Sequence, residues 1–149
     1  MRAGACALRQ AQPQNHPCSM TRHLDAAALR ELAQLAEQSD PPPCACTKTP
    51  LDGWQSQPLS LDERQLEQIG TLVDENEAEP TFAEHLPGKA GYWSEEAPIA
   101  PRYFPYNRCG VWKCSLCGRL YLRYTEGGGY FVDQRIRALK ACLIEDAPL

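Results

Sequence analysis

The sequence is short of the branched apolar and aromatic residues that build a large hydrophobic core. Leu, Ile, Val and Phe together supply 27 of its 149 residues, a low fraction that is typical of chains close to disorder. No apolar run approaches the roughly 18 residues of a membrane span. A formal net charge of only −4 and nine Trp and Tyr residues favour a folded chain. The composition therefore excludes a membrane span and argues against a large α/β enzyme.

Histidine is also scarce, and the common catalytic motifs are missing. The three histidines at 16, 23 and 85 form no metal-binding spacing, and no His-Glu-x-x-His run is present. The glycine run 127–129 lacks the Lys-Ser/Thr that follows a phosphate-binding loop. Catalytic zinc usually has three protein ligands and an open water position, often with histidine. These absences make a thiol/redox or metal-dependent enzyme the least favoured functional class.

Charge is unevenly distributed along the chain. Residues 21–101 carry a net charge of −10, and residues 102–140 a net charge of +6. The simplest interpretation is that the two halves attract each other within one fold. A basic stretch of this size also allows contact with nucleic acid.

Residues 1–19 show no apolar periodicity and lack the 7–15-residue apolar core of a secretory signal. We expect this stretch to be disordered, or to be an over-extended start with translation beginning at Met20. Cys6, His16 and Cys18 therefore rank last among the candidate ligands.

Two helices are expected before the basic half. The first covers residues 22–38 within an N-terminal unit at 20–40, because apolar residues recur there at helical spacing and Thr21 is placed to cap it. The prolines at 41–43 end it. The second is predicted over residues 60–70, with a Ser-x-x-Glu capping box at its start and Gly70 as its C-terminal cap.

The basic half contains a cysteine motif followed by a β-hairpin pattern. Cys114 and Cys117 have the spacing at which two thiolates reach one tetrahedral Zn²⁺. Residues 119–124 then alternate, with Leu120, Leu122 and Tyr124 on one side and Arg119, Tyr121 and Arg123 on the other. The glycines at 127–129 predict the turn, and residues 130–132 the returning strand. A Cys-x-x-Cys-Gly run that enters a hairpin resembles one half of a zinc ribbon.

A second pair of ligands must come from elsewhere, and Cys44-Ala-Cys46 is the other close pair. We therefore expect Zn²⁺ bound by Cys44, Cys46, Cys114 and Cys117, which closes the long intervening segment. Two alternatives stay open: Cys109 replaces one of the Cys44/Cys46 pair, with His85 as a further candidate, or no metal binds. Cys142 lies in an apolar run and is predicted to be a buried free thiol.

A longer signature combines residues 44–54 (Cys-x-Cys-x-Lys-Thr-Pro-Leu-Asp-Gly-Trp), 106–114 (Tyr-Asn-Arg-Cys-x-Val-Trp-x-Cys) and 123–126 (Arg-Tyr-Thr-Glu). It resembles small uncharacterised bacterial proteins over residues 44–140. The resemblance supports the metal assignment and implies no activity.

The expected fold is α+β: a small antiparallel zinc-ribbon-like hairpin, one or two packed helices and long irregular loops, with residues 41–149 as a single zinc-stapled domain. The expected function is that of a small cytoplasmic zinc-binding protein with a structural four-cysteine site, acting as a protein-interaction module without membrane association. The alternative is a nucleic-acid-binding zinc ribbon, in which Arg119, Tyr121 and Arg123 form a basic and aromatic face that contacts phosphates and stacks a base.

Overall fold

The computed structural model describes residues 21–149. The predictions for residues 1–19, and with them Cys6, His16 and Cys18, lie outside the described residues. Within the described range, no helix is both long and apolar enough to cross a membrane.

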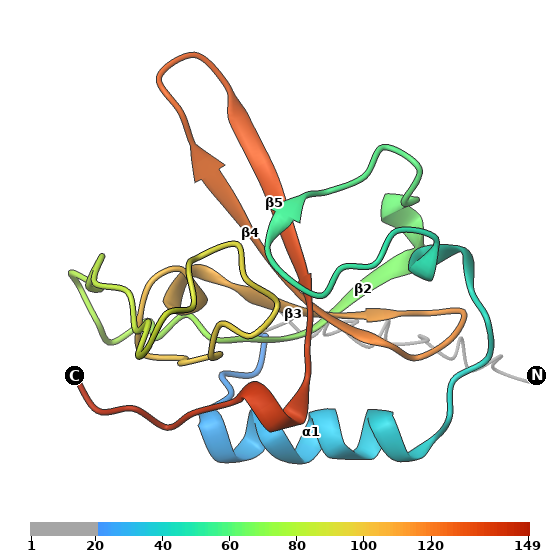
Figure 1. Ribbon diagram of the computed structural model, residues 1–149, viewed down its shortest axis with the longest axis horizontal. Helices are drawn as coiled ribbons and strands as arrows, with labels where there is room; N and C mark the ends of the chain where they lie inside the picture. The colour runs from blue at the N-terminus through green and yellow to red at the C-terminus, as the bar shows by residue number, and fades with distance from the viewer. Residues whose placement is uncertain (1–20) are drawn as a thin grey trace, which may run out of the picture.

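Within residues 21–149, one α-helix and one five-stranded antiparallel sheet form the main regular elements, so the α+β prediction with an antiparallel sheet is confirmed (Figure 1). The spatial order of the strands is β1-β5-β4-β3-β2. The elements are α1 (Ala26–Gln38), β1 (Gln55–Ser56), β2 (Leu66–Thr71), β3 (Gly110–Cys114), β4 (Leu120–Gly127) and β5 (Val132–Ala138).

The N-terminal helix begins later than the sequence predicts. Asp25, not Thr21, is the N-cap residue, and its side chain accepts a hydrogen bond from the Ala28 N–H at 2.8 Å. The preceding residues are extended, because the backbone of Leu24 donates to the Thr71 carbonyl at 2.9 Å. Pairing with β2 therefore outcompetes an additional helical turn.

The predicted helix over residues 60–70 is wrong. Only a short 3-10 turn forms at Glu63–Gln65, and the chain then continues as β2, which pairs with β3. Pairing with β3 overrides the local capping signal, as tertiary contacts often override local propensity. Gly70 is not a helix cap: a Cβ there would lie 2.6 Å from Leu24 Cδ1, so glycine permits close packing at this point.

The two faces of the sheet carry two separate hydrophobic clusters. On β4, Leu122 and Tyr124 belong to the cluster that contains Leu29 of α1, whereas Tyr121 belongs to the other. This side-to-side alternation is the one that the sequence predicts for residues 119–124. We call these clusters the helix side and the cysteine side, because the second contains Cys46, Cys114 and Cys117 with Cys44 packed against it.

The long segment between β2 and β3 contains no α-helix or strand, only a 3-10 turn at Tyr106–Arg108. The buried side chain of Arg137 holds this segment in place. The Arg137 guanidinium donates to the carbonyl oxygens of Glu95 at 3.1 Å and Ala97 at 2.7 Å, and to the Tyr106 hydroxyl. Trp54 Nε1 donates to the same hydroxyl at 3.2 Å. Trp54 and Tyr106 belong to the helix-side cluster, so these attachments do not involve the four cysteines of the other side.

The hairpin of β4 and β5 projects beyond the rest of the sheet (Figure 1). The returning strand begins at Val132 and runs to Ala138, later and longer than the predicted 130–132. The turn closes with a hydrogen bond from the Gly128 N–H to the Phe131 carbonyl at 2.8 Å. Tyr130, Phe131 and Val132 are left exposed at its end.

Candidate metal centre

Four cysteine side chains from distant parts of the chain meet on the cysteine side of the sheet. The Sγ atoms of Cys44, Cys46, Cys114 and Cys117 all lie within 4.8 Å of one another. Three of these residues are buried, and Cys44 is half-buried. The spacing of the cysteines in the sequence predicts these four residues as zinc ligands, and the structure brings all four sulfur atoms together.

The spacing of the sulfur atoms fits a single tetrahedral metal ion. Cys44 Sγ lies 3.8 Å from Cys114 Sγ, and Cys46 Sγ lies 3.5 Å from Cys117 Sγ. Zn–thiolate bonds of about 2.3 Å in a tetrahedron separate their sulfur atoms by about 3.8 Å. All four residues are free cysteines, since a disulfide requires about 2.05 Å. Both the donor atoms and their separations fit a four-thiolate site.

The turn between β3 and β4 positions the Cys114/Cys117 pair. Cys114 ends β3, and its N–H donates to the Arg119 carbonyl at 2.9 Å, while the Gly118 N–H donates to the Cys114 carbonyl at 2.8 Å. Gly118 has a φ of 82°, a left-handed conformation that side chains disfavour. The glycine thus permits the tight turn that directs both thiols to one point.

The Cys44/Cys46 pair sits on a single turn of 3-10 helix, Ala45–Thr47, that follows an extended Cys44. The Thr47 hydroxyl donates to the Cys44 carbonyl at 2.7 Å and closes this turn. Arg119 donates to the Pro42 carbonyl at 3.0 Å and so attaches the segment to the start of β4. Cys44 is therefore extended, whereas Cys46 lies within the turn.

Hydrogen-bond donors surround the sulfur atoms. The side-chain amide of Gln65 donates to Cys44 Sγ at 3.2 Å and to Cys114 Sγ at 3.3 Å. The Tyr121 hydroxyl donates to Cys46 Sγ at 3.1 Å. Donors in this outer shell orient ligands and stabilise their negative charge. The sequence patterns do not predict that Gln65 and Tyr121 donate to the sulfur atoms, because they favour a helix at Gln65 and a binding face at Tyr121.

The surroundings of Cys114 and of Cys46 shift the pKa values of these two thiols in opposite directions. Burial opposes ionisation of Cys114, but hydrogen bonds from the backbone of Cys117, from Gln65 and from the backbone of Leu116 outweigh it and lower its pKa to about 6. Burial raises the pKa of Cys46. Protein groups alone therefore stabilise a thiolate at Cys114, whereas four adjacent thiolates require a cation between them.

The alternative ligands do not reach the cluster. Cys109 is fully buried on the helix side, and its thiol donates to the Pro105 carbonyl at 3.3 Å. His85 Nε2 lies 2.9 Å from a carboxylate oxygen of Glu145. Cys142 was predicted to be buried, but it is exposed. Its run of apolar residues ends in a 3-10 turn at Ala141–Leu143, and Cys142 lies on the outside of that turn.

The proposed nucleic-acid face is largely inside the protein. Tyr121 and Arg123 are buried, and only Arg119 of the three is half-buried. The Arg123 guanidinium lies 4.4 Å above the Trp112 ring and pairs with Glu63 at 3.2 Å. The segment around residues 44–46 and the 63–65 turn therefore cover Tyr121 and Arg123, and nucleic-acid binding by this face stays a prediction.

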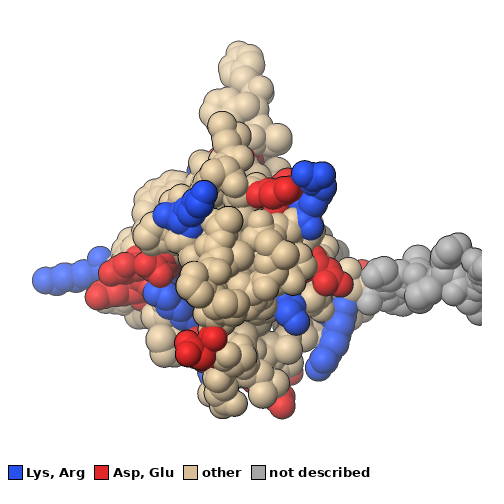
Figure 2. Space-filling model, turned by 90° about the vertical axis from the view of Figure 1, so that its right-hand side faces the viewer, with Lys and Arg blue, Asp and Glu red and all other residues tan. Residues whose placement is uncertain are grey.

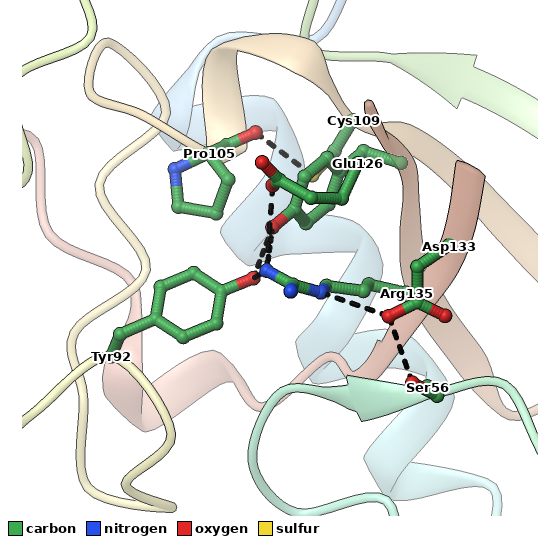
Figure 3. Close-up of polar contacts among 8 residues, drawn as sticks. Ser56, Tyr92, Pro105, Cys109, Glu126, Asp133 and Arg135 are labelled. Carbon is green, nitrogen blue, oxygen red and sulfur yellow. Dashed lines mark hydrogen bonds and ion pairs between the residues drawn. The ribbon is translucent and has the colours of Figure 1, made fainter. Parts of the chain in front are cut away.

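A second polar cluster lies at the base of the projecting hairpin (Figure 3). Arg135 contacts a carboxylate oxygen of Glu126 at 3.4 Å and of Asp133 at 3.2 Å, and donates to the hydroxyls of Tyr92 and Tyr124. Burial raises the pKa of Tyr92 and of Tyr124. Because these charged and polar groups satisfy one another, the cluster anchors the hairpin to the 92–93 loop.

Comparison with protein-family models, curated proteins and solved structures found no match to the chain.

Proposed function

We propose that the protein is a zinc-binding protein in which Cys44, Cys46, Cys114 and Cys117 hold one structural Zn²⁺, as in a zinc ribbon. The observation that carries this proposal is the cluster of four sulfur atoms within 4.8 Å of one another. Four soft thiolate donors in a tetrahedron favour Zn²⁺ over metals that prefer oxygen ligands. The set leaves no position for substrate, so the site is structural rather than catalytic.

The role of the ion is to fasten the segment around residues 44–46 to the turn between β3 and β4. The cysteine side has few other buried apolar groups, namely Leu51, Leu61, Leu66, Tyr121 and Ile136. A metal site adds folding free energy where the apolar core is small. Free thiols persist in reducing compartments, which supports a cytoplasmic location.

Metal analysis of protein purified under reducing conditions tests this proposal. Wild-type protein is expected to contain one zinc per chain. Cys117→Ser is expected to lose the zinc, and Cys142→Ser, the matched control at an exposed cysteine, to keep it. Reduced wild-type protein without bound zinc, or full zinc occupancy in Cys117→Ser, would contradict the site.

The domain that contains the proposed zinc site also has an exposed apolar hairpin end. We propose that it binds another protein through the end of the β4–β5 hairpin, which projects as an uncharged knob (Figure 2). Tyr130 is 103% exposed, Phe131 75% and Val132 72%. Exposed apolar patches on a rigid support are typical of protein-binding sites. A nucleic-acid role ranks lower, because Tyr121 and Arg123 are buried.

The double variant Tyr130→Ser/Phe131→Ser tests the hairpin. It is expected to retain the zinc content and melting temperature of wild type, while losing the proteins that wild type retains after cross-linking in cells. An unchanged set of cross-linked proteins would contradict this binding role.

A further inference from the structure

The four cysteine residues are not equally protected from solvent. Cys46, Cys114 and Cys117 are 3%, 0% and 9% exposed, while Cys44 is half-buried. Cys44 lies at the start of a short turn that follows three prolines, and Arg119 ties that segment to β4. A small solute from solvent therefore reaches the cluster first at Cys44.

The neighbour that faces Cys44 comes from the other cysteine pair. Cys44 Sγ and Cys114 Sγ are 3.8 Å apart, and the amide of Gln65 donates to both. These two residues are 70 positions apart in the sequence. A bond between them would link the 44–46 segment to the end of β3.

We propose that Cys44 is a modification site for hydroperoxides, and that its oxidation produces a Cys44–Cys114 disulfide and releases the metal. This inference rests on the proposed zinc site for the release step. The disulfide itself depends only on the exposure of Cys44 and the proximity of Cys114.

The chemistry is balanced with the hydroperoxide as the two-electron oxidant. The Cys44 thiolate attacks the terminal peroxide oxygen, breaking the O–O bond and forming a sulfenic acid; the leaving alkoxide or hydroxide takes a proton. The Cys114 thiolate then attacks the Cys44 sulfur, forms the S–S bond and expels hydroxide, which is protonated to water. Two of the four thiolates are consumed, so Zn²⁺ leaves with its charge unchanged.

The Cys44–Cys114 disulfide makes the loss of Zn²⁺ reversible. The disulfide holds the two segments together in place of the metal, so reduction regenerates both thiolates within reach of the other pair. Treatment with a dithiol and zinc is therefore expected to restore one zinc per chain.

The experiment treats the full-length Cys142→Ser protein with hydrogen peroxide, since this substitution removes the one cysteine classed as exposed among residues 21–149. A chromogenic chelator follows zinc release, and mass spectrometry follows the loss of two hydrogens. After tryptic digestion, Cys44 and Cys46 share peptide 31–48, and Cys114 and Cys117 share peptide 114–119. Fragmentation between the cysteines of each peptide therefore identifies the linked pair.

Cys44→His in the same background is the matched variant, because it keeps a zinc-ligating atom but forms no disulfide at position 44. The zinc that this variant binds is expected to leave at least about tenfold more slowly under peroxide, with the rate measured per bound ion. A wild-type release rate in a zinc-loaded Cys44→His protein would overturn the proposal.

The two proposals fail separately. Protein that contains no zinc before peroxide treatment contradicts the metal site. In that case the mass-spectrometric identification of the linked cysteines still tests whether Cys44 forms a disulfide with Cys114. A Cys46–Cys117 disulfide, a disulfide within either pair, or full zinc retention after peroxide overturns the modification site while leaving the zinc site in place. A Cys44–Cys114 link formed together with zinc release supports both.

Discussion

At the scale of single residues, the polar groups around the sulfur atoms distinguish this cluster from a chance meeting of buried thiols. Gln65 and Tyr121 together direct donors at Cys44, Cys46 and Cys114. A thiolate accepts such bonds more strongly than a thiol, because hydrogen bonds to charged groups are the stronger ones. The arrangement is therefore suited to ligands that carry negative charge.

Tyr121→Phe isolates one of these bonds, since it keeps the buried ring and removes only the hydroxyl. We expect zinc still to bind one per chain, but with about 10- to 100-fold lower affinity. Competition with a chelator of known affinity measures the change. Tyr130→Phe removes a hydroxyl from an exposed ring and serves as the control, with affinity expected to match wild type. Equal zinc affinity in Tyr121→Phe and wild type would show that the O–H···S bond is unimportant.

Arg137 is a second residue with a testable role. Its buried guanidinium makes no ion pair within the part of the chain that the structure describes, and two carbonyl oxygens and the Tyr106 hydroxyl accept its hydrogen bonds. Arg137→Met is expected to lower the free energy of unfolding by about 2–4 kcal/mol, because buried acceptors lose their donors. Zinc content is expected to stay at one per chain, since these contacts lie on the helix side.

Denaturant unfolding of Arg137→Met against Arg64→Met measures this effect. Arg64 is exposed and pairs with Asp62 at 3.2 Å on the surface. Its replacement is expected to leave the free energy of unfolding unchanged within the error of the measurement, because an exposed ion pair contributes little to stability. Comparable losses in the two variants would contradict the anchoring role of Arg137.

At the scale of elements, the secondary structure could be predicted from the sequence where it depends on a local pattern. It could not be predicted where pairing with another strand determines whether a segment is helical or extended. The alternation at residues 119–124 identified β4, because a strand between two packed faces leaves a period of two. Residues 60–70 carry a capping box and a terminal glycine, yet only a 3-10 turn forms at Glu63–Gln65 and β2 begins at Leu66. Pairing with β3 decides this segment, and no residue within it shows that a partner strand is available.

The four clustered cysteines were also predictable from the sequence, because their spacing is a local pattern. Metal-binding spacings are local, and only two close pairs follow Met20, at 44/46 and 114/117. Burial of Tyr121 and Arg123 was not predictable, because it depends on the 44–46 segment and the 63–65 turn folding over β4. The exposure of Cys142 was missed because an apolar run does not show which side chain of a turn points outward.

Gly70 provides the test at this scale. Gly70→Ala places a Cβ 2.6 Å from Leu24 Cδ1 and 3.3 Å from the Arg22 carbonyl, so the entry to α1 must shift. We expect a loss of about 1–3 kcal/mol in unfolding free energy, the usual cost of overpacking. Gly127→Ala is the control, because a Cβ there meets no atom within 4 Å. If both variants had equal stability, the packing of Leu24 on β2 would be contradicted.

At the scale of the whole molecule, the two sides of the sheet differ in what holds them. The helix side contains the larger apolar cluster, with α1, Trp54 and the aromatic residues packed around it. The cysteine side contains a smaller cluster in which the four thiols take a central place. Removal of the metal is therefore expected to destabilise the cysteine side more than the helix side.

Chelation of the metal under reducing conditions tests this division. Residues 44–51 are expected to lose hydrogen-exchange protection first, while α1 retains more of its protection. The melting temperature is expected to fall by at least about 10 °C, since structural zinc contributes several kcal/mol to folding. Uniform loss of protection across both sides would contradict separate support of the two clusters.

The central claim is that four cysteine thiolates, and no other groups, hold one zinc ion. X-ray absorption at the zinc edge of the purified, reduced protein measures the ligand atoms directly. We expect four sulfur neighbours at about 2.3 Å and no nitrogen or oxygen neighbour. A first shell with two or three sulfur atoms completed by nitrogen or oxygen near 2.0 Å would contradict it.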